Sequence, residues 1–319
     1  MSKKKIVFMG TPKFAVPILE MLIENFGVEL VITQPDKRVG RKKVLTAPPV
    51  KAIAEKNNIP VLQPEKISND KEILNALKKI NPDIIITAAY GQLVPDSILE
   101  IPKYKCINVH GSLLPKLRGG APIQYAILED HRKTGVTIMY MVKKLDAGDM
   151  ISKVEIDIFD SDNYETLHDK LSYAGCELLK ETLPKIFSGD ISPQKQDNSM
   201  ATFARNILHD DEKISWEENA RVIFNKVRAL DPNVGAFTYL DKNILKIWSA
   251  EEIIVKENYN KKVGTIVKQD KKFLYVLCGN NTILKIKELQ IAGKKRMPVV
   301  NFLSNMKDYV GITFGDNND

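Results

Sequence analysis

Residues 4–34, "KKIVFMGTPKFAVPILEMLIENFGVELVITQ", carry the pattern that decides the fold of the first half of the chain. An apolar strand at 4–10 is followed by a stretch with helical spacing and then by a second apolar strand at 28–34. Thr11 is the predicted N-cap of the helix, with Pro12 in its first position. A helix between two strands is typical of parallel neighbours in one sheet.

The same alternation continues beyond this unit. Further strands are expected at 59–63, 83–89, 106–110 and 135–142, and helices near 71–80, 121–128 and 163–187. This order predicts an α/β, Rossmann-like domain: an open, mostly parallel sheet with helices on both faces. Ligands of such sheets bind beyond the carboxyl ends of the strands.

The pattern changes after residue 187. The polar stretch "SGDISPQKQDNSMATF", 188–203, is typical of a connector, and one further helix is expected at 217–229. Short strands then follow at 236–240, 245–250, 263–269, 273–279 and 282–290, which predicts a small β-barrel of the OB-like kind. We therefore expect an N-terminal domain at 1–189, a linker at 190–208 and a C-terminal domain at 209–319.

Composition and charge narrow the class of protein. The 319 residues are 44% hydrophobic and 27% charged, as in folded globular chains. The N-terminus has too short an apolar run for a signal peptide, and no run approaches a membrane span. Three separated cysteines fit a reducing compartment, so a cytoplasmic location is expected. The net charge of +7 suits a polyanionic partner or simply reflects a Lys-rich composition.

Gly10 follows the first strand, where a dinucleotide-binding glycine motif would begin. The segment "GTPKFA" has one glycine where that motif needs three, so the sequence argues against a nicotinamide-cofactor site.

Asn108 and His110 end an apolar strand, within "CINVHGSLLPKLRGGAPIQ", residues 106–124. Residues two apart in a strand share a face, so an amide donor and an imidazole point together toward the carboxyl end. Together they could stabilise an oxyanion forming on a carbonyl. The alternative is a pair of hydrogen-bonded polar core residues.

A third element, "KKLDAGDM", contains Asp146 and Asp149 after the strand at 135–142. A carboxylate there could orient His110 or accept a proton, while the alternative for an Asp near glycine is turn formation. The pattern favours Asp146 over Asp149 only slightly. Since no nucleophile elbow, P-loop or zinc spacing is present, direct transfer or hydrolysis is favoured and no metal is expected.

Two clusters of basic residues stand out. One surrounds Gly40 in "QPDKRVGRKKVLTAPP", with only Asp36 opposing it, and the other is the turn "AGKKRMPV". Their cations are Lys37, Arg38, Arg41, Lys42 and Lys43 in the first and Lys294, Lys295 and Arg296 in the second. Either cluster could bind a phosphodiester backbone, or be an ordinary solvated surface.

These segments together resemble the methionyl-tRNA formyltransferase family. The resemblance runs nearly end to end, through "GTPKFA", "AAYGQLVP", "INVHGSLLPKLRGGAPIQ", "GVTIM", "LDAGDM", "VRALDP", "KIWSA" and "AGKKRM". It implies a Rossmann-like formyltransferase domain and an OB-like domain that helps to hold tRNA. It also implies transfer of the formyl group of 10-formyltetrahydrofolate to the α-amine of methionine on initiator tRNA, for translation initiation.

The resemblance also assigns residues. The family's catalytic Asn, His and Asp fall on Asn108, His110 and Asp146. Asn108 and His110 would stabilise the oxyanion, and Asp146 would orient the imidazole and assist removal of the amine proton. The implied folate-contacting residues are Ser112, Leu113, Leu114, Pro115, Gly91, Gln92 and Leu93. Both basic clusters are implied tRNA contacts, with Arg41 on the family's important arginine, and we expect a monomer without membrane association.

One segment departs from the family. Where the family often reads Asn-Pro-Trp-Pro-Gly, this chain has Asp231-Pro232-Asn233-Val234-Gly235, without the aromatic residue. Two alternative functions explain only some of these features. A hydrolase, or a formyltransferase for sugars or small amines, needs only Asn108, His110 and Asp146. A noncatalytic RNA-binding module needs only the barrel and the basic loops.

Overall fold

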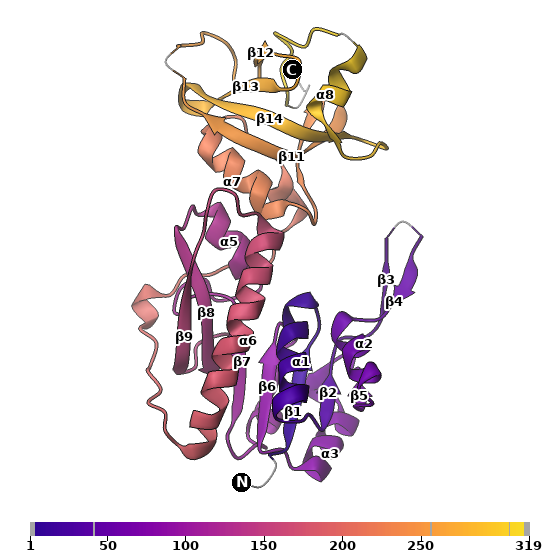
Figure 1. Cartoon of the computed structure of the whole chain (residues 1–319), viewed down its shortest axis with the longest axis vertical. Helices are drawn as coiled ribbons and strands as arrows, with labels where there is room; N and C mark the ends of the chain where they lie inside the picture. The colour runs from indigo at the N-terminus through magenta and orange to yellow at the C-terminus, as the bar shows by residue number, and fades with distance from the viewer. Residues whose placement is uncertain (1–3, 41, 256, 306, 316–319) are drawn as a thin grey trace. The chain divides into compact units, whose positions relative to one another are not determined.

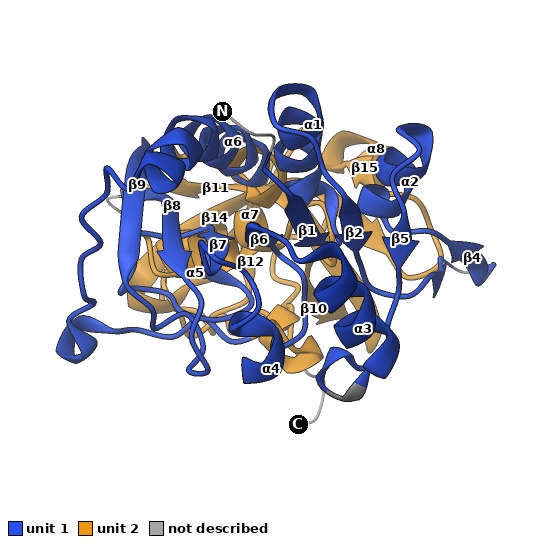
Figure 2. Cartoon of the chain, turned by 90° about the horizontal axis from the view of Figure 1, so that it is seen from below, with its two compact units in different colours: residues 1–122, 133–157, 168–205 blue, residues 123–132, 158–167, 206–319 orange. Residues whose placement is uncertain are grey.

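The computed structural model describes residues 4–40, 42–255, 257–305 and 307–315. The chain forms two compact units, coloured separately in Figure 2. Unit 1 comprises residues 1–122, 133–157 and 168–205, and unit 2 comprises residues 123–132, 158–167 and 206–319. The sequence predicted a functional N-terminal domain at 1–189, a linker at 190–208 and a C-terminal domain at 209–319, and this assignment stays a prediction.

A seven-stranded sheet in the order β5-β2-β1-β6-β7-β8-β9 is the centre of unit 1. Its strands are β1 (Ile6–Gly10), β2 (Leu30–Ile32), β5 (Val61–Leu62), β6 (Ile84–Ala88), β7 (Cys106–His110), β8 (Lys133–Tyr140) and β9 (Met150–Asp157). The pairs from β5 to β7 are parallel, and β8 and β9 continue the sheet antiparallel. The prediction of a mostly parallel α/β sheet is therefore confirmed. The edge strand β9 was not predicted from the sequence.

Helices cover both faces of this sheet. They are α1 (Val16–Asn25), α2 (Pro49–Lys56), α3 (Lys71–Ile80), α4 (Asp96–Leu99) and α6 (Tyr164–Ser188). In Figure 2, α1 and α6 lie on one side of the strands, and α3 and α4 lie on the other. On the second side, Ile73 and Leu77 of α3 belong to one buried cluster with Val7 and Ile85 of the sheet. The strands β1, β2 and β6 are buried along their whole length, which explains why they read as continuous apolar runs.

The predicted N-cap of the first helix is wrong. A short 3₁₀ turn, Lys13–Ala15, precedes α1, and no side chain caps either element. The Thr11 hydroxyl instead donates to the backbone carbonyl of Tyr90 at 3.0 Å. A tertiary acceptor thus competes successfully with the local capping role, because a hydroxyl can bond to either.

An exposed ribbon follows β2. It consists of β3 (Lys37–Val39) and β4 (Val44–Thr46), paired antiparallel. Figure 1 shows that the ribbon extends away from the helices and strands of unit 1. The predicted basic loop is therefore a two-stranded structure with defined side-chain directions.

Unit 2 is built around an antiparallel sheet in the order β10-β11-β14-β13-β12, with β15 added beside β14. The strands are β10 (Ala236–Leu240), β11 (Asn243–Ile253), β12 (Ile266–Gln269), β13 (Leu274–Cys278), β14 (Thr282–Ile291) and β15 (Met297–Pro298). Its helices include α7 (Ala220–Leu230) and α8 (Val299–Phe302). The five predicted strands all form, which confirms a small antiparallel, barrel-like C-terminal fold. Asn219, rather than residue 217, starts α7 by accepting a hydrogen bond from Val222 N at 3.0 Å.

Arginines of α7 bind the two short segments of unit 2 that precede residue 206 in the sequence, 123–132 and 158–167. The Arg221 guanidinium lies 2.6 Å from Asp130 Oδ1 and 2.8 Å from Asp160 Oδ2. Arg228 donates to the carbonyls of Phe159 and Asp162. These bonds attach the residues 123–132 and 158–167 to α7.

Candidate active site

Asn108 lies on β7 and is half-buried. Its register partner on β6 is Thr87, whose hydroxyl donates to Asn108 Oδ1 at 2.7 Å. Among the described residues, none accepts a hydrogen bond from Asn108 Nδ2. The amide therefore keeps its two N–H donors for a ligand.

His110, at the end of β7, is only 5% exposed. Its Nε2 lies 3.0 Å from the carbonyl oxygen of Leu117, and its Nδ1 lies 3.7 Å from Asp146 Oδ2. A carbonyl can only accept, so Nε2 carries a hydrogen and Nδ1 is the atom that can gain or lose one. The 3.7 Å separation is longer than a hydrogen bond. The imidazole Nδ1 and the carboxylate thus face each other without a direct hydrogen bond between them.

Backbone groups hold Asp146 in place. Its Oδ2 accepts a hydrogen bond from Gly119 N at 2.9 Å, and its own backbone has the left-handed φ of 47°. Gly119 has φ 121°, and a Cβ there would lie 2.5 Å from Ala204 O, so only glycine fits. Asp149, the alternative carboxylate, contributes its backbone carbonyl to Tyr140 N. The structure therefore brings Asp146, of the two acids, to His110.

A network of buried polar side chains also holds the loop that carries Asp146. Arg118 is 1% exposed and donates to Gln196 Oε1 at 2.7 Å and to Asn198 Oδ1 at 3.0 Å. Gln196 Nε2 in turn donates to the carbonyls of Asp146 and Gly148, both at 2.8 Å. The sequence analysis missed Gln196 because it lies in the polar connector, where no local signal marks it.

The predicted folate-contacting loop follows β7 directly. Ser112 is fully buried, and its hydroxyl donates to Lys116 O at 2.6 Å, so the side chain stabilises the loop itself. Thr137 of β8, the register partner of His110, donates to Ser112 O and accepts from Leu114 N. Leu113 and Pro115 are half-buried and Leu114 is buried. The loop is therefore rigid, and its half-buried apolar side chains are the ones that a ligand could contact.

The second predicted folate segment follows β6. Gly91 is exposed with φ 89°, and Leu93 is 68% exposed. The Gln92 amide is occupied instead, since its Oε1 accepts from Ile67 N at 2.8 Å and its Nε2 donates to Pro64 O at 3.2 Å. Gln92 thus joins two loops, and Leu93 is the side chain of this segment available to a ligand.

The described cations of the ribbon have no acidic partner among the described residues. Lys37, Arg38, Lys42 and Lys43 form no ion pair with any residue that the structure describes, and Arg41 lies outside the described residues. The nearby Asp36 is bound by Lys51 at 2.9 Å. The ribbon therefore presents uncompensated positive charge.

The basic turn in unit 2 differs. The Arg296 guanidinium bonds to Glu288 and lies 2.5 Å from Asp231 Oδ1. Asp231 belongs to the segment that departs from the family pattern, and its Oδ2 accepts from Asn163 Nδ2 at 2.8 Å. Arg296 is therefore not the free cation that the sequence suggested. Lys294 and Lys295 are exposed and form no ion pair with a described residue.

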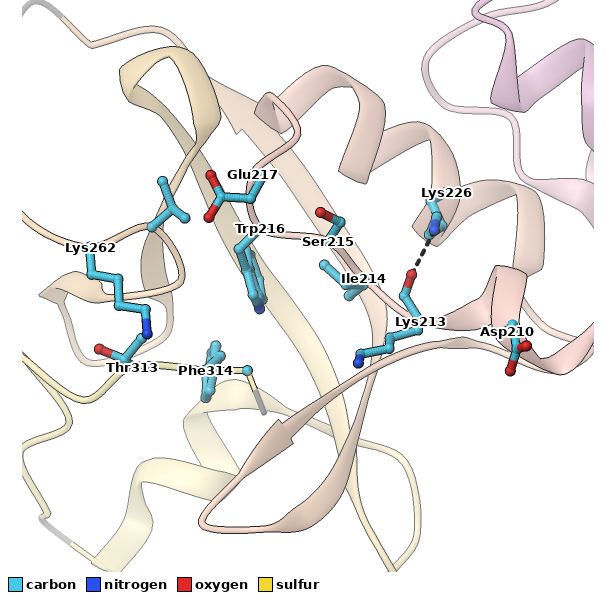
Figure 3. A pocket seen from close by; sticks show the side chains of 12 residues that line it. Asp210, Lys213, Ile214, Ser215, Trp216, Glu217, Lys226, Lys262, Thr313 and Phe314 are labelled. Atoms are coloured by element: carbon cyan, nitrogen blue, oxygen red, sulfur yellow. Dashed lines mark hydrogen bonds between the residues drawn. The ribbon is translucent and has the colours of Figure 1, made fainter. Parts of the chain in front are cut away.

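A cavity of about 710 Å³ lies in unit 2, beside the start of α7 and residues 313–315 (Figure 3). Its lining includes Lys226, whose ammonium donates to Lys213 O at 2.6 Å, and burial lowers the pKa of this lysine. The Trp216 side chain in the wall donates its N–H to Thr238 Oγ1 at 3.0 Å. None of the predicted catalytic residues lines this cavity.

The described residues give no support for a cysteine nucleophile, a metal site or a membrane-spanning helix. Burial raises the pKa of Cys106 and Cys278 to about 12 and that of Cys176 to about 11, so the thiols stay protonated at neutral pH and are poor nucleophiles. Across the described ranges, no group of three His, Cys, Asp or Glu side chains could hold a metal ion. No described helix is both long and apolar enough to cross a membrane.

Comparison with known proteins matches both halves of the chain. Residues 4–183 match the family model described as formyl transferase, and residues 206–307 match that of the formyl transferase C-terminal domain. The chain is 52% identical over 316 residues to the methionyl-tRNA formyltransferase of Bacillus subtilis, covering 99% of both chains. It is 51% identical over 304 residues to that of Staphylococcus aureus strain N315, covering 95% of this chain and 97% of the relative.

Solved structures share the fold at low identity. An N-formyltransferase from Helicobacter canadensis, in complex with folinic acid and dTDP-3-aminofucose, is 20% identical with a TM-score of 0.65, over 90% of this chain and 99% of that one. HypX from Aquifex aeolicus, in complex with tetrahydrofolic acid, is 15% identical with a TM-score of 0.61, over 97% of this chain. The chain spans 48% of the HypX chain.

Proposed function

Because the chain belongs to the formyl transferase family, we propose that it transfers the formyl group of 10-formyltetrahydrofolate to the α-amine of methionine on initiator tRNA. The observation that carries this function is full-length identity of about half to methionyl-tRNA formyltransferases. In this chain Asn108 and His110 lie two residues apart on β7, and His110 faces Asp146. The reaction forms a bond between the amine nitrogen and the formyl carbon and breaks the bond from that carbon to N10. One proton leaves the amine, and one ends on N10.

Asn108 is proposed as the donor to the developing oxyanion. Its Nδ2 has no acceptor among the described residues, and Thr87 already binds the opposite end of the amide. An amide that is held in place costs no reorganisation when charge develops on the formyl oxygen. Such a donor typically contributes about 10²- to 10³-fold to the rate.

His110 and Asp146 are proposed to receive the amine proton. Nε2–H is occupied by Leu117 O, so the atoms proposed to accept the proton are His110 Nδ1 and the carboxylate oxygens of Asp146, whose Oδ2 lies 3.7 Å from Nδ1. Asp146 Oδ1 accepts no hydrogen bond from a described residue and can contact the amine directly. This assignment changes the expected role of Asp146, because Leu117 rather than Asp146 orients the imidazole.

The substrates are proposed to bind on either side of this trio. Leu113, Pro115 and Leu93 offer apolar contacts to a folate, which supplies the formyl group. The basic ribbon offers phosphate contacts to the tRNA, since lysines without acidic partners can each replace a counterion. A monomeric state and a cytoplasmic location remain predictions from the sequence.

The test is formylation in vitro. We expect the protein to formylate methionine on initiator tRNA in the presence of 10-formyltetrahydrofolate, and to leave uncharged tRNA and small amines unmodified. Asn108→Ala should lower kcat by about 10²- to 10³-fold while both substrates still bind. Asp146→Asn should also lower kcat, whereas the matched variant Asp149→Asn, in the same loop, should keep it.

Two outcomes would overturn the proposal. Formylation of a small amine in preference to the charged tRNA would show a different formyltransferase. An Asn108→Ala enzyme with nearly wild-type kcat would remove the amide from the reaction.

A further inference from the structure

Thr87 is a hydroxyl residue inside an otherwise apolar strand. The β6 sequence is Ile-Ile-Ile-Thr-Ala, all buried, and Thr87 itself is 2% exposed. A buried hydroxyl on a central strand needs a partner, because an unpaired one is destabilising. The partner here is a proposed catalytic side chain.

Three acceptors surround the Thr87 hydroxyl. Asn108 Oδ1 lies 2.7 Å away, and Ile107 O and Met141 Sδ each lie 3.2 Å away. The hydroxyl has one hydrogen, and 2.7 Å is the usual O–H···O distance, whereas N–H···O bonds usually measure about 2.9–3.0 Å. The shortest contact is thus an O–H donated to the amide oxygen.

The direction of this bond decides which end of the amide faces away from Thr87. With Oδ1 bound to the hydroxyl, Nδ2 is the free end, and it can donate to an oxyanion. In the reversed amide, Nδ2 would donate to Thr87, the hydroxyl would turn to Ile107 O, and Oδ1 would face the developing negative charge. That arrangement repels the transition state.

We infer that Thr87 is a positioning residue for formyl transfer: its hydroxyl selects the amide orientation in which Asn108 donates to the oxyanion. The inference rests on the proposed function, because it requires the oxyanion role of Asn108. Thr87 itself touches no reacting atom. It acts on the rate through the fraction of the enzyme whose amide is oriented correctly.

Strand β7 also has a threonine partner on its other side, and the contacts of that threonine differ from those of Thr87. Thr137 of β8 is the register partner of His110, but its hydroxyl binds the backbone of Ser112 and Leu114 rather than a catalytic side chain. Thr134, also on β8 and 2% exposed, has no hydrogen-bond partner for its hydroxyl among the residues that the structure describes. It offers a matched control: a buried threonine on a neighbouring strand without a catalytic contact.

The experiment compares Thr87→Val, Thr87→Ser and Thr134→Val in the full-length protein, with steady-state kinetics for both substrates. Thr87→Val should lower kcat by about tenfold, the effect of losing one ordinary hydrogen bond, with KM values within about twofold. Thr87→Ser, which keeps the hydroxyl, should restore kcat. Thr134→Val should leave kcat unchanged.

A double-mutant cycle with Asn108→Ala separates positioning from a general effect on folding. Once the amide is absent, Thr87→Val should cause no further loss of kcat. If Thr87→Val retains wild-type kcat, or lowers kcat equally with and without the amide, the inference is overturned. If Asn108→Ala alone keeps wild-type kcat, it is the proposed function that fails. Thermal unfolding is measured for each variant. A loss of kcat that is explained by unfolding of the variant would count against the positioning role.

Discussion

The described basic side chains of the β3–β4 ribbon and two arginines of unit 2, Arg221 and Arg296, are all positively charged in the sequence but differ in their partners in the structure. The described ribbon cations form no ion pairs, and its one nearby acid is bound by Lys51. In unit 2, Arg221 is held by Asp130 and Asp160, and Arg296 by Asp231 and Glu288. A free cation can release counterions on binding a polyanion, whereas a neutralised one contributes to stability. Positive charge in a sequence therefore predicts nucleic-acid contact only where carboxylates are absent.

Among the basic side chains of this comparison, the largest expected effect comes from removing the described cations of the ribbon. We expect the triple variant Lys37→Ala, Lys42→Ala, Lys43→Ala to raise the KM for charged tRNA at least about tenfold at physiological salt. The slope of log KM against log salt should become shallower by about 2–3, about one unit for each lysine. Kinetics at several salt concentrations measure both quantities.

A matched triple variant controls for net charge. Lys71, Lys78 and Lys79 are exposed on α3, so replacing them by Ala removes the same charge elsewhere in unit 1. This variant should keep the wild-type salt slope. If the two triple variants have equal slopes of log KM against log salt, the ribbon is an ordinary solvated surface and not a tRNA contact.

A smaller effect, on stability, is expected at Arg221. Its hydrogen bonds hold the pKa of Asp130 and Asp160 below their usual value of 3.8. The stabilisation is therefore present above about pH 4 and is lost as the pH falls through the lowered pKa values. Arg221→Gln should cost about 1–2 kcal/mol of unfolding free energy at pH 7, discounted for the partly exposed carboxylates. The difference from wild type should shrink between about pH 4 and pH 2, as measured by urea unfolding. A difference that is constant across this range would contradict the linkage.

The smallest effect is expected at Arg296. Its guanidinium is 38% exposed, so Arg296→Gln should lower the free energy of unfolding by only about 1 kcal/mol. The salt slope for tRNA should not change, because the charge is already compensated. Lys295→Gln, at an exposed lysine that forms no ion pair with a described residue, serves as the stability control and should leave unfolding unchanged. A shallower salt slope in Arg296→Gln would show that this arginine contacts phosphate after all.

The sequence predicted helices and strands more completely than it predicted contacts between side chains. The helix at 71–80 and the strand at 106–110 matched the structure at both ends, because each has a clear apolar period within its own length. The edge strand β9 was missed: only one face of it is half-buried, and the sequence Met-Ile-Ser-Lys-Val-Glu-Ile-Asp alternates weakly. Thr11 was misassigned because its acceptor, Tyr90, is 79 residues away.

The candidate site shows the same division. Strand alternation and loop composition made residues 108, 110 and 146 candidates, and the family resemblance selected 146 over 149. The residues that hydrogen-bond to them could not be predicted. Thr87 lies 21 residues before Asn108, and Gln196 lies 50 residues after Asp146. Thr87 did leave a signal, as a polar residue in an apolar strand. Gln196 left none.

The sequence by itself determined the order of strands and helices, the uneven distribution of positive charge and the polar side chains at the end of β7. These follow from periodicity and composition, which are properties of neighbouring residues. Only the tertiary structure decided that Leu117 O fixes the imidazole, that Thr87 binds the Asn108 amide and that Arg296 is neutralised. Hydrogen bonds and ion pairs act over about 3 Å, so they depend on which distant segments the fold brings together.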